Sequence, residues 1–101
     1  GATWGTVLGA YNAVTNTGAS VTGGMYNTAS GQNSSVSGGL ETTASGDYSS
    51  VAGGFQSTAS APNSFVAGGY RNRANGWFSS AVGGRENYTE GTHALVTPHN
   101  P

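Results

Sequence analysis

The sequence lacks cysteine entirely and contains very few charged residues. Of its 101 residues, 7% are charged, and the formal net charge at pH 7 is −1. Without cysteine, a disulfide framework and a thiolate zinc site are both excluded. The weak charge provides no basic surface for nucleic acid or for an anionic membrane. No run approaches the roughly 18 consecutive apolar residues of a membrane-spanning helix.

Glycine and small polar residues are abundant instead, and they are arranged in a repeat. The 18 glycines belong to a composition that, without order, is typical of disordered segments. Three consecutive segments nevertheless align: VTGGMYNTASGQNSS (21–35), VSGGLETTASGDYSS (36–50) and VAGGFQSTASAPNSF (51–65). This fixed period of 15 residues is the signature of a repeat architecture.

Six such blocks tile residues 6–95. The first block, residues 6–20, is degenerate, and Val96 begins a seventh block that Pro98 and Pro101 interrupt. Degenerate end blocks are typical of capping repeats. We therefore expect a lead-in over residues 1–5, a six-coil domain over residues 6–95 and a tail over residues 96–101.

The residues at a given position of the block share a character. Position one is mostly Val, position five is large and mostly apolar, and position nine is small. In chain order these residues are Thr6, Val21, Val36, Val51, Val66, Ala81 and Val96 at position one; Ala10, Met25, Leu40, Phe55, Tyr70 and Arg85 at position five; and Val14, Ala29, Ala44, Ala59, Ala74 and Thr89 at position nine. Because positions one, three and five share one face of a strand, we expect positions one and five to fill the core. A Gly-Gly pair at positions three and four and frequent Gly at position eleven indicate positive φ or close backbone approach.

The glycine content and the short block argue against a helical repeat. Two or more Gly in each block, together with many Ser, Thr and Asn, lower the helix propensity too far. The remaining architecture is an all-β, parallel β-solenoid in which each block forms one coil with two short strands joined by Gly-rich turns. Because coils stack about 4.8 Å apart, six coils would form a rod roughly 29 Å long.

The narrow core has a consequence for assembly. One coil buries too little apolar surface to offset the conformational entropy of ordering all its residues. We therefore expect the coils to bury a second face against other chains. The small, uncharged side chains at position fourteen would suit such close packing, and these are Ser34, Ser49, Ser64 and Ser79.

The repeat also resembles a known family. The pattern S-V-x-G-G-x-x-x-x-A-S-G-x-x-S is similar to the YadA-like head repeat of trimeric autotransporter adhesins. The matching residues of three blocks are Ser35-Val36, Gly39, Ala44, Gly46 and Ser49; Ser50-Val51, Gly54, Ala59 and Ser64; and Phe65-Val66, Gly69, Ala74, Gly76 and Ser79. The family commonly has Ile where this chain has the first Gly of each pair, so the core should be thinner there, with large residues at position five filling the space.

The resemblance implies a left-handed parallel β-roll that assembles as a homotrimer. It further implies an extracellular place on the bacterial surface, anchored in the outer membrane through regions outside this chain. The implied function is non-catalytic adhesion to a host matrix protein, a glycan or a cell-surface receptor, with a role in virulence. Similar repeats occur in phage tail fibres, so a receptor-binding fibre or a structural spacer segment is the alternative.

Catalytic, cofactor-binding and metal-binding residues are not expected. The only acids are Glu41, Asp47, Glu86 and Glu90, and they do not form the paired carboxylates of general acid–base catalysis. His93 and His99 have no cysteine or paired acid beside them. The Gly-Gly pairs lack the Lys of a phosphate-binding loop. The pattern therefore predicts a protein that is not an enzyme.

Aromatic and arginine residues gather late in the chain. We expect a ligand or interface patch there, because such residues are enriched at binding hot spots. Its members are Tyr70, Arg71, Arg73, Trp77, Phe78, Arg85 and Tyr88. Within the stack we expect a surface ion pair between Arg71 and Glu86 and a cation–π contact between Arg73 and Tyr88.

A row of Thr-Ala-Ser triplets supports another alternative. The triplets begin at Thr28, Thr43 and Thr58, and the row ends at Arg73. Flat threonine rows on a solenoid with a 15-residue repeat resemble those of some insect ice-binding proteins, which usually carry disulfides. Ice binding is therefore a further candidate function.

Overall fold

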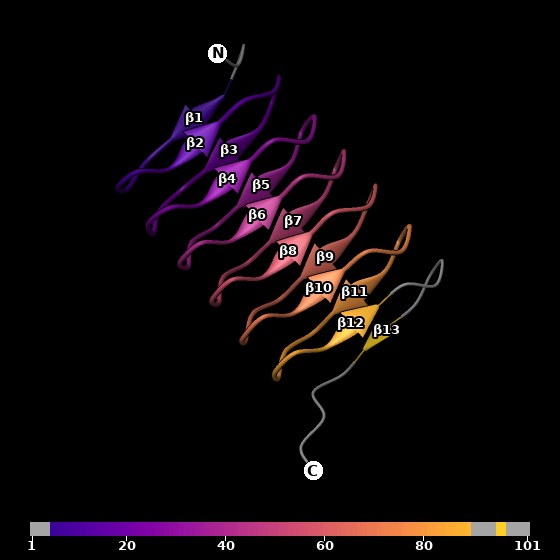
Figure 1. The fold of residues 1–101 in the computed structure, drawn as a ribbon. Coiled ribbons are helices and arrows are strands. Elements are labelled where there is room, and N and C mark those ends of the chain that lie inside the picture. The colour runs from indigo at the N-terminus through magenta and orange to yellow at the C-terminus, as the bar shows by residue number, and fades with distance from the viewer. Residues whose placement is uncertain (1–4, 90–94, 97–101) are drawn as a thin grey trace.

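The structure is a computed structural model that describes residues 5–89 and the strand at residues 95–96. The chain winds into a parallel β-solenoid in which each coil contributes one strand to each of two sheets (Figure 1). The molecule is flat, with principal extents of 40 × 24 × 11 Å. The all-β solenoid expected from the repeat is confirmed.

Every strand consists of two residues, and the strands alternate between the two sheets. The odd-numbered strands form the seven-stranded sheet, which contains β1 (Thr6–Val7), β3 (Ser20–Val21), β5 (Ser35–Val36), β7 (Ser50–Val51), β9 (Phe65–Val66), β11 (Ser80–Ala81) and β13 (Leu95–Val96). The even-numbered strands form the six-stranded sheet, which contains β2 (Ala13–Val14), β4 (Thr28–Ala29), β6 (Thr43–Ala44), β8 (Thr58–Ala59), β10 (Arg73–Ala74) and β12 (Tyr88–Thr89).

The pairing of residues between neighbouring coils confirms the repeat period from β3 onward, but the first coil departs from it by one residue. From β3 onward, residues 15 positions apart are partners, as with Val21 and Val36. In the first coil, however, Val7 rather than Thr6 pairs with Val21, so the expectation that Thr6 occupies position one is wrong. The first coil has one residue fewer between its strand and its turn, because Ala10 still pairs with Met25 across 15 positions.

The hydrophobic core is a narrow file of Val and Ala. Position one of the odd strands and position nine of the even strands are fully buried, at Val21, Val36, Val51, Val66 and Ala81 and at Ala29, Ala44, Ala59 and Ala74. The expectation that position five joins this core is wrong, since Met25 is 40% and Tyr70 37% exposed. The turn at the Gly-Gly pair ends the two-residue alternation before position five, so those side chains lie outside the coil.

The space beside this file is filled by buried polar side chains at position seven. They are Asn27, Thr42, Ser57, Asn72 and Asn87. Asn72 Nδ2 donates to the carbonyls of Gly68 (2.6 Å) and Gly84 (3.2 Å), and its Oδ1 accepts from the Asn87 amide at 2.9 Å. This ladder satisfies turn groups that would otherwise be buried without partners.

Three positions of the block adopt positive φ in the turns, and one of them, position thirteen, holds Asn33, Tyr48, Asn63 and Phe78. The second Gly of each pair does so as expected, for example Gly54 at 102°. Position six also has φ between 52° and 59°, yet it holds Tyr11, Tyr26, Glu41, Gln56, Arg71 and Glu86. Because such residues avoid the left-handed region, the sequence did not indicate this second reversal. Gly46 at position eleven lies close to the next coil instead, since an added Cβ would be 2.1 Å from the carbonyl oxygen of Ala61, although Ala61 itself occupies this position one coil later.

The serines at position fourteen lie inside their own coil. Ser34, Ser49, Ser64 and Ser79 are all at most 1% exposed, so the expectation that they pack against other chains is wrong. Their role is local, because Ser34 Oγ and Ser64 Oγ each donate at 2.7 Å to the carbonyl three residues earlier. That bond closes the turn.

Ser49 and Ser64 provide a matched pair for measuring this bond. The Ser49 hydroxyl is buried and, within residues 5–89, it has no hydrogen-bond partner. We expect Ser64→Ala to lower the free energy of unfolding by about 1 kcal/mol, and Ser49→Ala to leave it unchanged or raise it slightly. Urea unfolding of both variants tests this, and an equal loss in the two would contradict it.

Candidate functional site

The structure divides the seven expected patch residues between two edges of the flat coil. Tyr70, Arg71, Arg73, Arg85 and Tyr88 lie in or beside the turns that contain the Gly-Gly pairs, which we call the glycine edge. Trp77 and Phe78 lie in the turn between β10 and β11, on the opposite edge (Figure 1). The patch is therefore not continuous.

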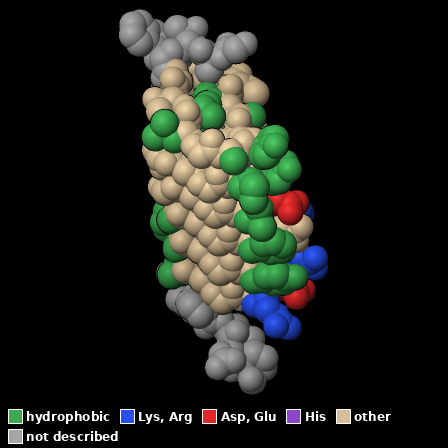
Figure 2. Space-filling view, turned by 90° about the vertical axis from the view of Figure 1, so that its left-hand side faces the viewer, with side chains coloured by type: hydrophobic (Ala, Val, Ile, Leu, Met, Phe, Trp, Pro, Cys, Tyr) green, Lys and Arg blue, Asp and Glu red, His purple; other side chains and the backbone are tan. Residues whose placement is uncertain are grey.

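The side chains at position five form a partly exposed apolar ladder along the glycine edge. We use this name for Met25, Leu40, Phe55 and Tyr70, which pair in register through backbone bridges. The rings of Phe55 and Tyr70 stack with centroids 5.3 Å apart. Figure 2 shows hydrophobic side chains gathered in a strip along one edge of the stack of coils. Contiguous apolar surface of this kind is typical of interaction sites.

The first Gly of each pair has space around it. A Cβ added to Gly38, Gly53 or Gly68 would meet no atom within 4 Å. The contacts within residues 5–89 therefore do not require glycine at position three, in contrast to position four. This row of glycines lies beside the apolar ladder and has open space at each Cβ position. Another surface could therefore approach the backbone closely there.

A groove runs along the corner between the glycine edge and the even-numbered sheet. Its larger part has a volume of about 570 Å³ and is lined by residues at positions six to eight of four successive coils: Glu41, Gln56, Thr58, Arg71, Asn72, Arg73, Glu86, Asn87 and Tyr88. A second hollow of about 450 Å³ shares Glu41 and is lined also by Tyr26 and Thr43. We call the two together the corner groove.

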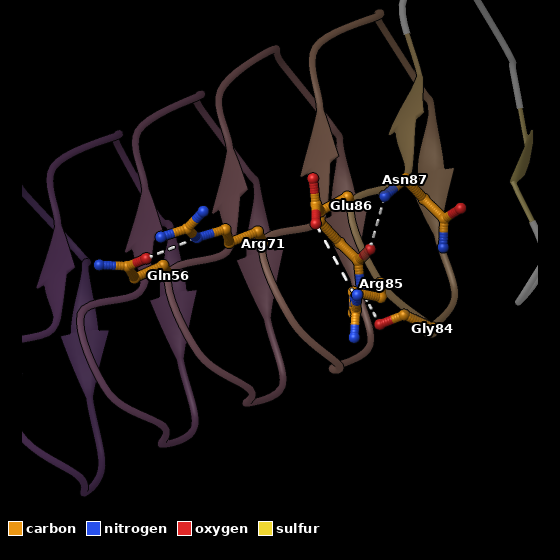
Figure 3. Close-up of polar contacts among 7 residues, drawn as sticks. Gln56, Arg71, Gly84, Arg85, Glu86 and Asn87 are labelled. Carbon is orange, nitrogen blue, oxygen red and sulfur yellow. Dashed lines mark hydrogen bonds and ion pairs between the residues drawn. The ribbon is translucent and has the colours of Figure 1, made fainter.

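The charged side chains of the corner groove pair differently from the sequence expectation. Arg71 Nε donates to Gln56 Oε1 at 2.9 Å, and its guanidinium lies 5.1 Å from the centre of the Tyr70 ring. Glu86 instead lies 3.8 Å from Arg85 Nε. Figure 3 shows Arg71 extending toward Gln56 and away from Glu86. The expected Arg71–Glu86 ion pair is therefore wrong, because each partner has a nearer contact.

Tyr88 is held in place at one end of the corner groove. The Arg73 guanidinium lies 5.7 Å from the centre of its ring, which confirms the expected cation–π contact. Asn75 Nδ2 donates to the Tyr88 hydroxyl at 2.6 Å, and Asn75 in turn bonds to Ser60 Oγ. The ring is fixed from two sides although the residue is 49% exposed.

Sequence reasoning missed Glu41, Gln56 and Asn75 as members of this site. Glu41 and Gln56 share position six with Arg71, so the period itself placed them in one row. They were missed because the patch was chosen by residue type, as aromatic and arginine residues, and not by position in the block.

Chemistry at an acidic or histidine cluster has no support in the described part of the chain. Residues 5–89 contain no group of three or more His, Asp or Glu that could hold a metal ion. His93, His99 and Glu90 lie outside the described residues. The same described part contains no helix long and apolar enough to cross a membrane.

Fold and surface together define the class as a flat, parallel β-solenoid repeat protein. Comparison with protein-family models, curated proteins and solved structures gave no match.

Proposed function

We propose that the chain is a non-catalytic head segment of a trimeric bacterial surface adhesin. Three chains would form left-handed β-rolls packed together by their glycine edges. The trimer would be displayed outside the cell and would attach to a host matrix protein, a glycan or a cell-surface receptor. The repeat and its resemblance to YadA-like heads support this proposal.

The observation that carries the proposal is the apolar ladder. It leaves four large apolar side chains along one edge of a protein whose own core consists of Val and Ala. Covering the ladder would add the apolar burial that a single coil lacks. Another copy of the same chain fits because its ladder repeats at the same coil spacing, so apolar residues meet in every coil.

Charge at the ladder is the direct test of this assembly. We expect the double variant Leu40→Glu/Phe55→Glu to lose the trimer, because burying two carboxylates in an apolar interface is costly. Light scattering should give the monomer mass, or circular dichroism should show loss of β structure.

The matched control is Tyr48→Glu. Tyr48 is 58% exposed and lies on the opposite edge, so its variant should keep the wild-type mass. A trimer mass for the ladder variant would contradict the proposed interface.

Adhesion is tested with the purified trimer on immobilised matrix proteins, on glycans and on cells. Saturable binding to any of these surfaces would support the adhesin. Absence of binding to all three would favour the structural spacer, and binding only to bacterial surfaces would favour the phage tail fibre.

The threonine row supports ice binding as a second candidate. Thr28, Thr43 and Thr58 pair in register on the even-numbered sheet, in β4, β6 and β8. Their neighbours Ala29, Ala44 and Ala59 are buried, so the threonines point to the outside of the coil. Thermal hysteresis at micromolar protein would favour this function, and its absence would remove it.

A further inference from the structure

We propose that the corner groove binds a short acidic oligosaccharide, with the ligand's carboxylate held by Arg71 and Arg73 and one sugar ring stacked on Tyr88. This inference rests on the proposed adhesive function and names the ligand class and the residues. It distinguishes the corner groove from the apolar ladder, which we assign to assembly.

Two arginines of the groove favour an anionic group beside them, although two acids, Glu41 and Glu86, line the same groove. The chain has three basic residues, and two of them, Arg71 and Arg73, line the groove. Within residues 5–89, neither forms an ion pair, since the acid nearest to them in the stack, Glu86, contacts Arg85 at 3.8 Å. Guanidinium groups bind carboxylates through paired hydrogen bonds.

Arg71 is also oriented before any ligand arrives. The bond to Gln56 uses Nε, and no described residue accepts from its two terminal nitrogens. The donors at Nη1 and Nη2 therefore remain for a ligand. Orientation by Gln56 and by the Tyr70 ring lowers the entropy that binding must overcome.

Tyr88 provides the stacking surface at the end of the groove. Aromatic rings contact the apolar face of a sugar ring, while a neighbouring polar group bonds its hydroxyls. The contacts from Arg73 and Asn75 hold the Tyr88 ring in one orientation. Such a fixed, half-exposed ring is suited to stacking.

The repeat of the groove matches an extended saccharide chain. Position six presents Glu41, Gln56, Arg71 and Glu86 on successive coils. Coils are about 4.8 Å apart, which is comparable to the length of one sugar unit. Successive sugars can therefore place their hydroxyls against successive planar polar side chains, of which the Glu carboxylates accept hydrogen bonds, Arg71 donates them and Gln56 does both.

A peptide added as an extra strand fits the groove less well. The backbone groups along its floor are already paired between coils, as in the bonds from Thr58 N to Asn72 O and from Arg73 N to Asn87 O, both 2.9 Å. No backbone edge is open there for strand addition. The exposed partners are side chains, which suits a hydroxyl-rich ligand.

The test measures binding of the wild-type protein, at its native assembly state, to matched saccharides by calorimetry. The probes are sialyllactose with lactose, and the trimer of galacturonic acid with its methyl ester. We expect at least one acidic probe to bind about tenfold or more tightly than its neutral counterpart, and this difference to shrink at high salt. Arg71→Gln and Arg73→Gln should each weaken binding of the acidic probe by about tenfold.

Two further variants test the stacking on Tyr88 and provide a control on the opposite edge. Tyr88→Ala should weaken both members of a probe pair, because it removes the ring and not the charge. Trp77→Ala on the opposite edge should leave the affinity unchanged. Circular dichroism and mass, measured for each variant, identify any loss caused by unfolding.

Several results would overturn the inference. They are equal binding of the acidic and neutral probes, no binding of either acidic probe, equally tight binding of an aspartate-rich peptide, or loss of binding in Trp77→Ala alone. Failure of all saccharides while the trimer still adheres to matrix proteins would reject this inference and leave the proposed function intact. Binding of an acidic probe by a protein with the mass of one chain would support this inference and contradict the proposed trimeric adhesin.

Discussion

Replacing Gly54 by alanine is expected to lower the free energy of unfolding by about 2–5 kcal/mol. Gly54 has φ of 102°, a conformation that L-residues with a side chain rarely adopt, and an added Cβ would lie 2.6 Å from the Gly69 carbonyl oxygen. That oxygen accepts the bond from the Phe55 amide at 2.9 Å. The methyl group would therefore strain the turn and displace a bond that joins two coils.

Gly53→Ala is the control for this variant. Gly53 is the adjacent residue in the same pair, and an added Cβ there would have no atom within 4 Å. Its unfolding free energy should stay within about 1 kcal/mol of the wild type, since the remaining effect is on the unfolded chain. Urea unfolding at one protein concentration, with the mass measured alongside, compares the two. A loss at Gly54 no greater than that at Gly53 would contradict this account of the turn.

The second large effect is expected at Asn72, in the buried polar ladder. Asn72→Leu should lower the free energy of unfolding by about 2–4 kcal/mol, because it leaves the Gly68 carbonyl and the Asn87 amide without their side-chain partners. The hydrophobic gain from leucine does not offset two unpaired groups in a narrow interior.

Asn72→Thr is the matched comparison. Threonine already occupies this position of the block at Thr42, where Oγ1 bonds to Asn27 Oδ1 at 2.8 Å and to the Gly38 carbonyl at 3.3 Å. We expect Asn72→Thr to cost less than half as much as Asn72→Leu in a thermal or urea unfolding experiment. A leucine variant as stable as the threonine variant would show that the buried polar ladder at position seven contributes little to the free energy of unfolding.

The sequence was sufficient to predict the solenoid, because one residue type recurred at each structural position. The Val at position one and the Ala at position nine identified the two buried columns. The positive φ of the second Gly also followed from its fixed position, since few other residues adopt that conformation.

The outer surface was predicted less well, for a local reason. The strands are only two residues long, so a two-residue alternation could not be extended through the turn to Met25 or Tyr70. A second reversal at position six, in residues such as Arg71 with φ of 53°, carried no sequence signal. The serines at position fourteen were misplaced because the turn, and not the strand alternation, sets their direction; in Ser34 the hydroxyl bonds to the carbonyl three residues earlier.

The candidate site depended on contacts between coils that residue type alone does not specify. The Arg73–Tyr88 contact followed from their shared position in the block. The sequence did not predict that Arg71 bonds to Gln56 and not to Glu86. Both neighbours lie one coil away from Arg71, and only the direction of its side chain decides between them.

The measurement that tests the central claim most directly is the mass of the wild-type chain in solution by light scattering at low micromolar concentration. The account predicts a mass near three times that of the 10.0 kDa chain, because in the proposed trimer other copies would cover the partly exposed apolar ladder and add to the narrow core. A folded protein with the mass of one chain would contradict it, since the solenoid would then be stable with its ladder in water.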